Sequence, residues 1–285
     1  MTADSRRYRE HYEKFGFSRT QRQAISWVNP GSTVLEVGCA SGYIGRALIE
    51  EKACRVTGLE LDPEAAREAR ANHVDVRQGS LEDPAFLASI NDRYDFVLAT
   101  DVLEHLREPA RVLSEFKRWL EPGGLAIISV PNIATWRIRY QLFFRGDFRY
   151  QETGILDRTH LHFFTWETLH ELLAEQSWTI RDTMVERWEL PVARKVLVEL
   201  PRSLGRLSKE QPGHGVMRRI HRPLQCWAHD LQCRGERAVE RVARRWPNLC
   251  ASHIALLLSA PPAAAASPVA GVPSLAREAI ASAHG

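Results

Sequence analysis

Short apolar runs alternate with longer segments of helical composition over most of the chain. Such runs are typical of parallel strands that are buried on both faces of a sheet. Their alternation with helical segments predicts an α/β fold in which helices cover both sides of the sheet. The runs that predict strands are residues 34–37, 55–61, 74–78, 94–100, 125–130, 178–188 and 252–258.

A glycine-rich turn connects the first predicted strand to a helical segment at 46–52. Gly38, Gly42 and Gly45 allow the backbone to approach a ligand closely, and the start of the helix presents free N–H groups. A dinucleotide-binding turn needs glycine at its first, third and sixth positions, but Ala40 occupies the third. The spacing therefore disfavours a dinucleotide. Because Ala40 carries a methyl group, we expect its φ angle to avoid positive values.

Two acids accompany this turn. Glu36 stands two residues before Gly38, and Glu60 closes the second predicted strand about twenty residues after the turn. An acid at the end of that strand is where such folds bind both ribose hydroxyls, because a carboxylate accepts two hydrogen bonds. The alternative for Glu60 is an exposed carboxylate at a strand end. Asp62-Pro63 then predicts the cap and first residue of the next helix.

These motifs, in this order, resemble the class I S-adenosylmethionine-dependent methyltransferases. The resemblance covers residues 34–132, from Glu36-x-Gly38-x-x-x-Gly42 through YDFVLATDVLEHL to LEPGGLAIISVPN. It implies a Rossmann-like sheet of seven strands, parallel except for an antiparallel terminal hairpin. It also implies S-adenosylmethionine as the cofactor and S-adenosylhomocysteine as the product. The residues that the resemblance assigns to cofactor binding are Glu36, Gly38, Cys39, Ala40, Gly42, Glu60, Leu61, Ser80, Leu81, Thr100 and Asp101.

Two of these assignments have an alternative. Related enzymes often have an acid where Ser80 stands, to accept a hydrogen bond from the adenine amino group. Ser80 can accept more weakly, and Leu81 could pack on the adenine face. The alternative is a plain turn that leads to a helix cap at Asp83-Pro84.

A long crossover at 133–166 follows the fifth predicted strand and alternates aromatic and basic residues. Its length suggests a functional lid. Its end, GILDRTHLHFFTWETLHELL, resembles methyltransferases associated with bacterial polysaccharide, glycan or lipid-linked metabolism. The core also resembles the methionine- and ubiquinone-biosynthesis branches. The residues that we expect to bind the methyl acceptor are Asn132, Tyr150, Arg158 and His162.

The chemistry needs few side chains, because methyl transfer from a sulfonium depends mainly on alignment and exclusion of water. For a hydroxyl acceptor, histidine is the base best matched to neutral pH. His160 is the first candidate and His105 the second, although either could instead fix a loop by hydrogen bonding. Asp101, Glu104 and His105, if they share a helical turn, could bind a divalent cation. Leu-Glu-His is widespread in related enzymes without metal, so we assign none.

The chain is expected to divide into five parts. Cap helices occupy 1–30, the methyltransferase core 31–190, and the final core strand 251–259. A helical insertion at 191–250 separates strands six and seven; from 181 to 250 there are fifteen Lys and Arg against eight Asp and Glu. This insertion could bind an acidic substrate, a membrane surface, a partner enzyme or a second copy of the chain, or could be a solvated elaboration. The Ala- and Pro-rich tail, 260–285, is expected to be disordered.

Composition restricts the function further. A net charge of +3 over 285 residues is too small to indicate nucleic acid as the main partner. Five cysteines without a C-x-x-C pair favour a reducing, cytoplasmic setting, and we see neither a signal peptide nor a membrane span. We therefore expect a methyltransferase acting on oxygen of a sugar-, lipid- or quinone-like small molecule. The alternative is a non-catalytic cofactor-binding subunit that supports another enzyme.

Overall fold

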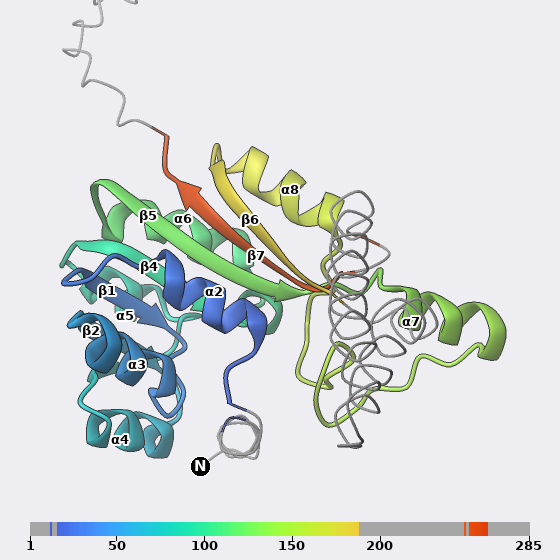
Figure 1. Ribbon diagram of the computed structural model, residues 1–285, viewed down its shortest axis with the longest axis horizontal. Coiled ribbons are helices and arrows are strands. Elements are labelled where there is room, and N and C mark those ends of the chain that lie inside the picture. Colours follow the sequence, from blue (N-terminus) through green and yellow to red (C-terminus); the bar gives the residue numbers. More distant parts are fainter. Residues whose placement is uncertain (1–11, 13–15, 188–247, 249–250, 262–285) are drawn as a thin grey trace, which may run out of the picture.

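The computed structural model describes residues 12, 16–187, 248 and 251–261 (Figure 1). The strands are β1 (Thr33–Val37), β2 (Arg55–Glu60), β3 (Asp75–Gln78), β4 (Tyr94–Thr100), β5 (Leu120–Pro131), β6 (Thr179–Arg187) and β7 (Ala251–Ser259). The α-helices are α2 (Arg19–Trp27), α3 (Tyr43–Lys52), α4 (Pro63–Ala71), α5 (Pro84–Ser89), α6 (Pro109–Trp119), α7 (Trp136–Tyr140) and α8 (Trp166–Glu175). A 3₁₀ turn spans Leu103–His105, and a π-helical turn spans Gln141–Arg145.

One sheet contains all seven strands, in the order β3-β2-β1-β4-β5-β7-β6. The first five strands run parallel, whereas β7 pairs antiparallel with both β5 and β6. The predicted α/β sheet with its antiparallel hairpin is therefore confirmed. The strand order reverses between β1 and β4, and open α/β sheets bind ligands beyond the carboxyl ends of the strands at such a point.

Helices pack on both faces of the sheet, and the side chains of each strand alternate between them. Val34 packs with residues of α2, α3 and α4, whereas the adjacent Leu35 packs with α5, α6 and α8. In β4, Phe96 packs on the same face as Val34, and Val97 packs on the same face as Leu35. The near-continuous apolar runs in the sequence are explained by this burial on both faces.

Polar caps fix where several helices begin. Asp62 accepts hydrogen bonds from the N–H groups of Glu64 and Ala65, and Asp83 accepts one from Ala85. Thr165 and Thr168 form a reciprocal capping box at the start of α8. The caps predicted from Asp62-Pro63 and Asp83-Pro84 are therefore confirmed.

The start of β5 differs from the expectation. The sequence predicted a strand at 125–130, but Leu120 already pairs with Tyr94 of β4. The register then shifts, so that the next pair is Phe96 with Leu125. Gly123, with φ of 85°, lies in the residues between these pairs. The glycines thus form an irregularity inside the strand rather than a turn before it.

Parts of the expected organisation lie outside the described residues. These are most of the segment before Gly16, the insertion between β6 and β7 apart from Asn248, and the tail from Pro262 onward. Of the cap helices, the structure describes α2, which contacts β6 and β7. No helix within the described ranges is long and apolar enough to cross a bilayer.

Candidate functional site

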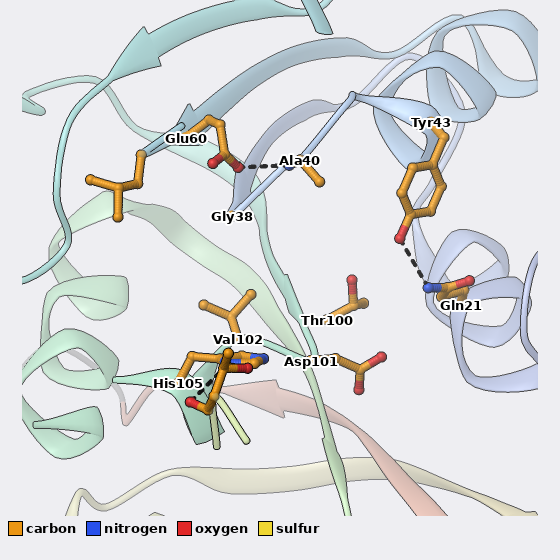
Figure 2. Close-up of a pocket in the computed structure, with 11 residues that line it drawn as sticks. Gln21, Gly38, Ala40, Tyr43, Glu60, Thr100, Asp101, Val102 and His105 are labelled. Atoms are coloured by element: carbon orange, nitrogen blue, oxygen red, sulfur yellow. Dashed lines mark hydrogen bonds between the residues drawn. The ribbon is translucent and has the colours of Figure 1, made fainter. Parts of the chain in front are cut away.

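A cavity of about 250 Å³ opens at the carboxyl ends of β1, β2 and β4, where the strand order reverses. Figure 2 shows the glycine turn and Glu60 on one side of it, and Asp101, Val102 and His105 on the other. The lining residues are Gln21, Gly38, Ala40, Tyr43, Glu60, Leu61, Thr100, Asp101, Val102, His105 and Thr159.

The glycine turn leaves no room for larger side chains at its two key positions. Gly38 has φ of 68°, and a Cβ there would lie 2.8 Å from Val102 Cγ2. Gly42, with φ of 76°, packs so closely on α4 that a Cβ would lie 2.9 Å from the Ala69 Cα. Gly38 therefore shapes the cavity wall, whereas Gly42 permits the contact between the turn and α4.

The expectation for Ala40 is wrong, because its φ is 47°. This left-handed conformation is disfavoured for a residue with a Cβ. The Ala40 N–H donates to Glu60 Oε2 at 2.8 Å, and the N–H groups of Gly38 and Cys39 both donate to the Leu59 carbonyl. These hydrogen bonds hold the turn from both sides and offset the local strain.

Glu60 bonds to both the glycine turn and the loop after β2 at this edge of the cavity. Its second carboxylate oxygen, Oε1, accepts from the Asp62 N–H at 2.8 Å. Partial burial raises the pKa of Glu60, and the N–H groups of Asp62 and Ala40 oppose that rise. The next residue, Leu61, also lines the cavity, and its side chain is 66% exposed. A carboxylate with an adjacent apolar side chain fits a ribose and its attached flat base.

Glu36 does not line the cavity but lies buried behind the turn. Its Oε2 has no hydrogen-bond partner among the described residues, and a Cβ at Gly45 would lie 2.8 Å from that atom. Burial raises the pKa of Glu36 to about 8, while the Gly45 N–H opposes the rise and Glu60 adds a smaller repulsion. Cys39 is also buried, and burial raises the pKa of its thiol.

The end of β4 supplies Thr100 and Asp101 to the cavity, as the resemblance implied. Asp101 has φ of 55°, and its carboxylate accepts a hydrogen bond from Ser129 Oγ at 2.8 Å. Its N–H donates to the Ser129 carbonyl at 3.0 Å. Ser129 of β5 therefore orients a strained acid at the cavity wall.

Ser80 and Leu81 are not among the residues that line the cavity. Ser80 Oγ accepts from the Glu82 N–H, and the Ser80 carbonyl accepts from the Asp83 N–H. Leu81 packs against the apolar core on the α5 and α6 side. The described geometry is that of a turn before the cap at Asp83, and contact with adenine stays a prediction.

Four lining residues were absent from the expected site: Gln21, Tyr43, Val102 and Thr159. Gln21 Nε2 donates to the Tyr43 hydroxyl at 3.2 Å, which connects α2 to the first residue of α3. Tyr12 stacks on the same ring at 4.7 Å between centroids. The position of Tyr43 directly after Gly42 was the one signal for its role. Nothing local connects Gln21 or Thr159 to the turn.

The two candidate histidines lie together, 4.8 Å apart between ring centroids. His105 lines the cavity, and its Nδ1 lies 3.1 Å from Thr159 Oγ1 and 3.3 Å from the Thr159 carbonyl oxygen. His160 is 7% exposed, and its Nδ1 lies 3.1 Å from the Ile155 carbonyl oxygen. Burial and the neighbouring His105 lower the pKa of His160. Of the two rings, His105 is the one on the cavity wall.

Glu104 completes a buried cluster with these rings. Side-chain ligand atoms of Glu104, His105 and His160 all lie within 4.8 Å of one another. Burial, with repulsion from Asp101, raises the pKa of Glu104 well above its usual range. The cluster differs from the cation set considered from the sequence, because the helical turn begins at Leu103 and Asp101 bonds to Ser129 instead. If the site holds a divalent cation, these three residues are its candidate ligands.

The residues expected to bind the acceptor are dispersed. Asn132 is fully buried, and its amide bonds to the Ala251 carbonyl and the Ala134 N–H. His162 Nε2 lies 3.2 Å from the Arg107 carbonyl oxygen. Arg158 pairs with Glu152, and Tyr150 is 54% exposed. None of the four belongs to the described lining of the cavity, so their role in acceptor binding stays a prediction.

The match to known families agrees with this geometry. A family model described as a methyltransferase domain matches residues 8–183. The chain belongs to this methyltransferase family. Its fold is that of the class I S-adenosylmethionine-dependent methyltransferases, and S-adenosylmethionine is the cofactor of that class, as the resemblance implied.

Curated relatives match a little over a third of the chain. A probable S-adenosylmethionine-dependent methyltransferase of Mycolicibacterium smegmatis is 41% identical over 109 residues, which are 37% of this chain and 40% of that protein. A ubiquinone biosynthesis O-methyltransferase of Xylella fastidiosa is 33% identical over 108 residues, 36% of this chain and 43% of that protein. The chain thus matches about two fifths of the length of these relatives.

Solved structures share the fold at low sequence identity. A methyltransferase of Archaeoglobus fulgidus matches with a TM-score of 0.52 at 19% identity, over 88% of this chain and 98% of that one. A Haloferax volcanii putative methyltransferase, solved with the Trm112 methyltransferase activator, matches with a TM-score of 0.53 at 17% identity, over 90% and 94%. These likenesses concern the architecture of the sheet and its helices.

Proposed function

We propose that the protein transfers a methyl group from S-adenosylmethionine to a hydroxyl of a small, quinone-like or lipid-linked acceptor. The observation that carries this proposal is the position of His105. It lies on the same cavity wall as Asp101 and Val102, and Glu60 and the glycine turn form the other side (Figure 2). A histidine at that position is suited to accept a proton from a hydroxyl at neutral pH.

The cofactor supplies a methyl carbon that is already activated by its sulfonium, and the protein supplies position and proton transfer. Glu60 accepts hydrogen bonds from the ribose, and Leu61 packs against the base. Gly38 leaves space where a Cβ would meet Val102. Leu61, Val102 and Tyr43 give the cavity apolar walls that exclude water.

Thr159 sets the orientation of His105. With a proton on Nδ1, the ring donates to the Thr159 carbonyl, which makes Nε2 the basic nitrogen. Thr159 is itself fixed, because its hydroxyl and its N–H both donate to Asp157 Oδ1 at 2.8 and 2.9 Å. Asp157, Thr159 and His105 therefore form a chain of contacts that holds the base in place. His160, behind His105, is a positioning residue in this proposal.

Two observations support the acceptor class. The Xylella relative is named for O-methylation in ubiquinone biosynthesis, and the segment after β5 presents several aromatic side chains. A quinone-like or lipid-linked acceptor offers the flat or apolar surface that aromatic side chains bind well. The basic residues of the same segment would suit an anionic group on the acceptor.

A methyl-transfer assay tests the proposal. Purified protein would be incubated with tritium-labelled S-adenosylmethionine and, in separate reactions, a catechol, a sugar alcohol and an aromatic carboxylate. We expect labelled ether from the catechol, and loss of that product in His105→Asn. Transfer to the carboxylate alone, or full activity in His105→Asn, would contradict the proposal.

A metal-assisted form of this transfer is the second candidate, because Glu104, His105 and His160 converge in one buried cluster. A divalent cation there would lower the pKa of an acceptor hydroxyl. Dialysis against EDTA separates the two forms. Activity that disappears and returns with Mg²⁺ or Zn²⁺ would favour the cation, whereas unchanged activity would favour His105 as the base.

The remaining features of the proposal concern location and partners. We place the protein in the cytoplasm, because Cys39 and Cys54 are free and buried and the other three cysteines form no C-x-x-C pair. The basic insertion at 191–250 is the proposed contact for a second copy or a partner enzyme. Its charge, rather than its structure, supports that role, because it lies outside the described residues apart from Asn248.

A further inference from the structure

Exposed aromatic side chains are concentrated in one segment, Trp136–Tyr150, here called the aromatic arm. Large apolar or aromatic side chains are exposed at nine positions in the described part of the chain, and seven of these lie in the arm. Phe143 is 83% exposed and Phe144 63%. Monomeric proteins rarely leave so many large apolar groups together in water unless the surface binds something. The exposed members are Trp136, Tyr140, Leu142, Phe143, Phe144, Phe148 and Tyr150.

The arm is an ordered row rather than a loose loop. Trp136, Tyr140 and Phe144 follow one another at helical spacing, with ring centroids 5.8 and 4.9 Å apart. Thr135 caps the start of α7, and Ile138, which is 4% exposed, anchors it. In Figure 1, α7 projects beyond the carboxyl end of β5, away from the helices that cover the sheet.

Arginines alternate with these rings. The arm carries four arginines and one acid, Asp147, which pairs with Arg149. Arg139 Nε donates to the Ala134 carbonyl, and the Arg145 guanidinium lies 5.9 Å from the Tyr140 ring centroid. Neither contact neutralises a guanidinium charge. Asp147 attracts Arg145 as well as Arg149, but four arginines against one acid still give the apolar row a positive rim.

We propose that the aromatic arm docks the protein on an anionic phospholipid bilayer. Aromatic rings prefer the boundary between headgroups and acyl chains, while arginines extend to the phosphates. The net positive charge of the arm argues against pairing with the arm of a second copy, because two surfaces of like charge repel each other. The ten residues Trp136–Arg145 are also too few to cross a membrane, so the arm lies on the surface.

Docking would also place the cavity near the bilayer. The arm continues through residues 151–159 to Thr159 and His160, and the N–H groups of Leu161 and His162 donate to the Glu104 carbonyl. The exposed surface is therefore continuous in sequence with Thr159, which contacts the candidate base His105. The docking itself does not depend on methyl transfer, so its test can fail or succeed independently of the proposed function.

Vesicle flotation tests the docking. The full-length protein would be mixed with vesicles of phosphatidylcholine alone or with one third phosphatidylglycerol, at low and high salt. We expect binding to the anionic vesicles that weakens with salt. The variant Phe143→Ser/Phe144→Ser should lose roughly tenfold or more of the partition coefficient, and Arg139→Gln/Arg145→Gln roughly tenfold to thirtyfold.

A matched control removes the same charge elsewhere. Arg55 and Arg67 are exposed on β2 and α4, outside the arm, so Arg55→Gln/Arg67→Gln should bind vesicles within about twofold of wild type. Equal losses in this control and in the arginine variant would overturn the proposal, as would no binding by wild type. Mass photometry gives a further decisive outcome, because a dimer that Phe143→Ser/Phe144→Ser dissociates would assign the arm to a second copy.

Discussion

Two glutamates are buried in the site, one beside the glycine turn and one beside the histidines, and they have different surroundings. Glu36 is 3% exposed and Glu104 is 1% exposed, and Oε2 of each has no hydrogen-bond partner in the described part of the chain. Glu36 is packed against the glycine-bearing start of α3. Glu104 instead lies within reach of two imidazole rings. Burial raises the pKa of both carboxyl groups.

The two sides of the cavity are built in different ways. We call the side with the glycine turn and Glu60 the cofactor side, and the side with His105 and Thr159 the acceptor side. The cofactor side uses backbone groups, glycines and the carboxylate of Glu60, all from the first 60 residues of the core. The acceptor side combines the turn after β4 with a segment more than fifty residues later, through contacts of Thr159 and His160 with His105. The Glu104 carboxyl lies beside two imidazoles with which it can exchange a proton, whereas Glu36 lies behind the glycine turn and outside the cavity lining. We therefore expect binding to depend on the first side and proton transfer on the second.

The largest expected effect is on the acceptor side. His105→Asn should lower kcat by roughly a hundredfold to a thousandfold, because it removes the proposed base. The dissociation constant for S-adenosylmethionine should change by less than about threefold, because most of the cavity lining remains. Steady-state kinetics and calorimetric titration measure the two quantities.

The matched variant is His73→Asn, since His73 is exposed in the turn between α4 and β3 and does not belong to the cavity lining. It should retain nearly all of the wild-type kcat. If His160→Asn abolished the rate while His105→Asn preserved it, the base would be His160, which the sequence placed first. The comparison between the two sides would still hold, but the roles of the two rings would be reversed.

A substitution on the cofactor side should change the affinity for S-adenosylmethionine. Glu60→Ala should weaken S-adenosylmethionine binding by about 3 kcal/mol, roughly a hundredfold, because hydrogen bonds to a charged carboxylate are lost. The strained Ala40 would also lose the acceptor of its N–H. Calorimetric titration measures the change, with Glu121→Ala as an exposed control. Unchanged affinity in Glu60→Ala would remove Glu60 from the cofactor site.

Gly31 and Gly42 have nearly equal φ angles, so a comparison of the two separates the cost of backbone strain from the cost of close packing at the glycine turn. Gly42→Ala should destabilise the protein by about 2 kcal/mol more than Gly31→Ala. Both substitutions force alanine into a left-handed conformation, but a Cβ at Gly31 meets nothing within 4 Å, whereas one at Gly42 meets Ala69. Urea unfolding measures both. Equal losses would show that backbone strain alone requires glycine at position 42.

The cofactor side was largely predictable from the sequence, because its signals are local. Glu36, Gly38, Gly42 and Glu60 follow one another within one strand-turn-helix-strand unit, and the apolar runs place that unit in the sheet. Within the glycine turn, the backbone conformation of Ala40 was predicted wrongly. Its methyl group disfavours positive φ, but the hydrogen bonds to Glu60 and Leu59, which hold the conformation, join separate segments.

The acceptor side could be predicted only as a set of candidates. Periodicity placed His105 after β4 and His160 in the crossover, but it could not bring their rings to 4.8 Å or show which ring lines the cavity. Thr159 was missed for the same reason, because its role depends on a contact across 54 residues. The sequence also gave no sign that the candidate cation ligands would include His160 in place of Asp101.

The smallest expected effect tests whether Glu36 only fills space. The raised pKa of about 8 means that folded Glu36 keeps its proton at neutral pH, whereas an unfolded carboxyl loses it above about 4.5. Unfolding therefore releases a proton between these values, and the stability contributed by Glu36 falls as pH rises through this range. Glu36→Gln keeps a neutral side chain and should flatten the fall between pH 5 and pH 8 by at least about 1 kcal/mol. Urea unfolding at both pH values measures this fall in the free energy of unfolding, with exposed Glu121→Gln as the control. If Glu36→Gln left the pH dependence unchanged, Glu36 would be ionised in the folded protein.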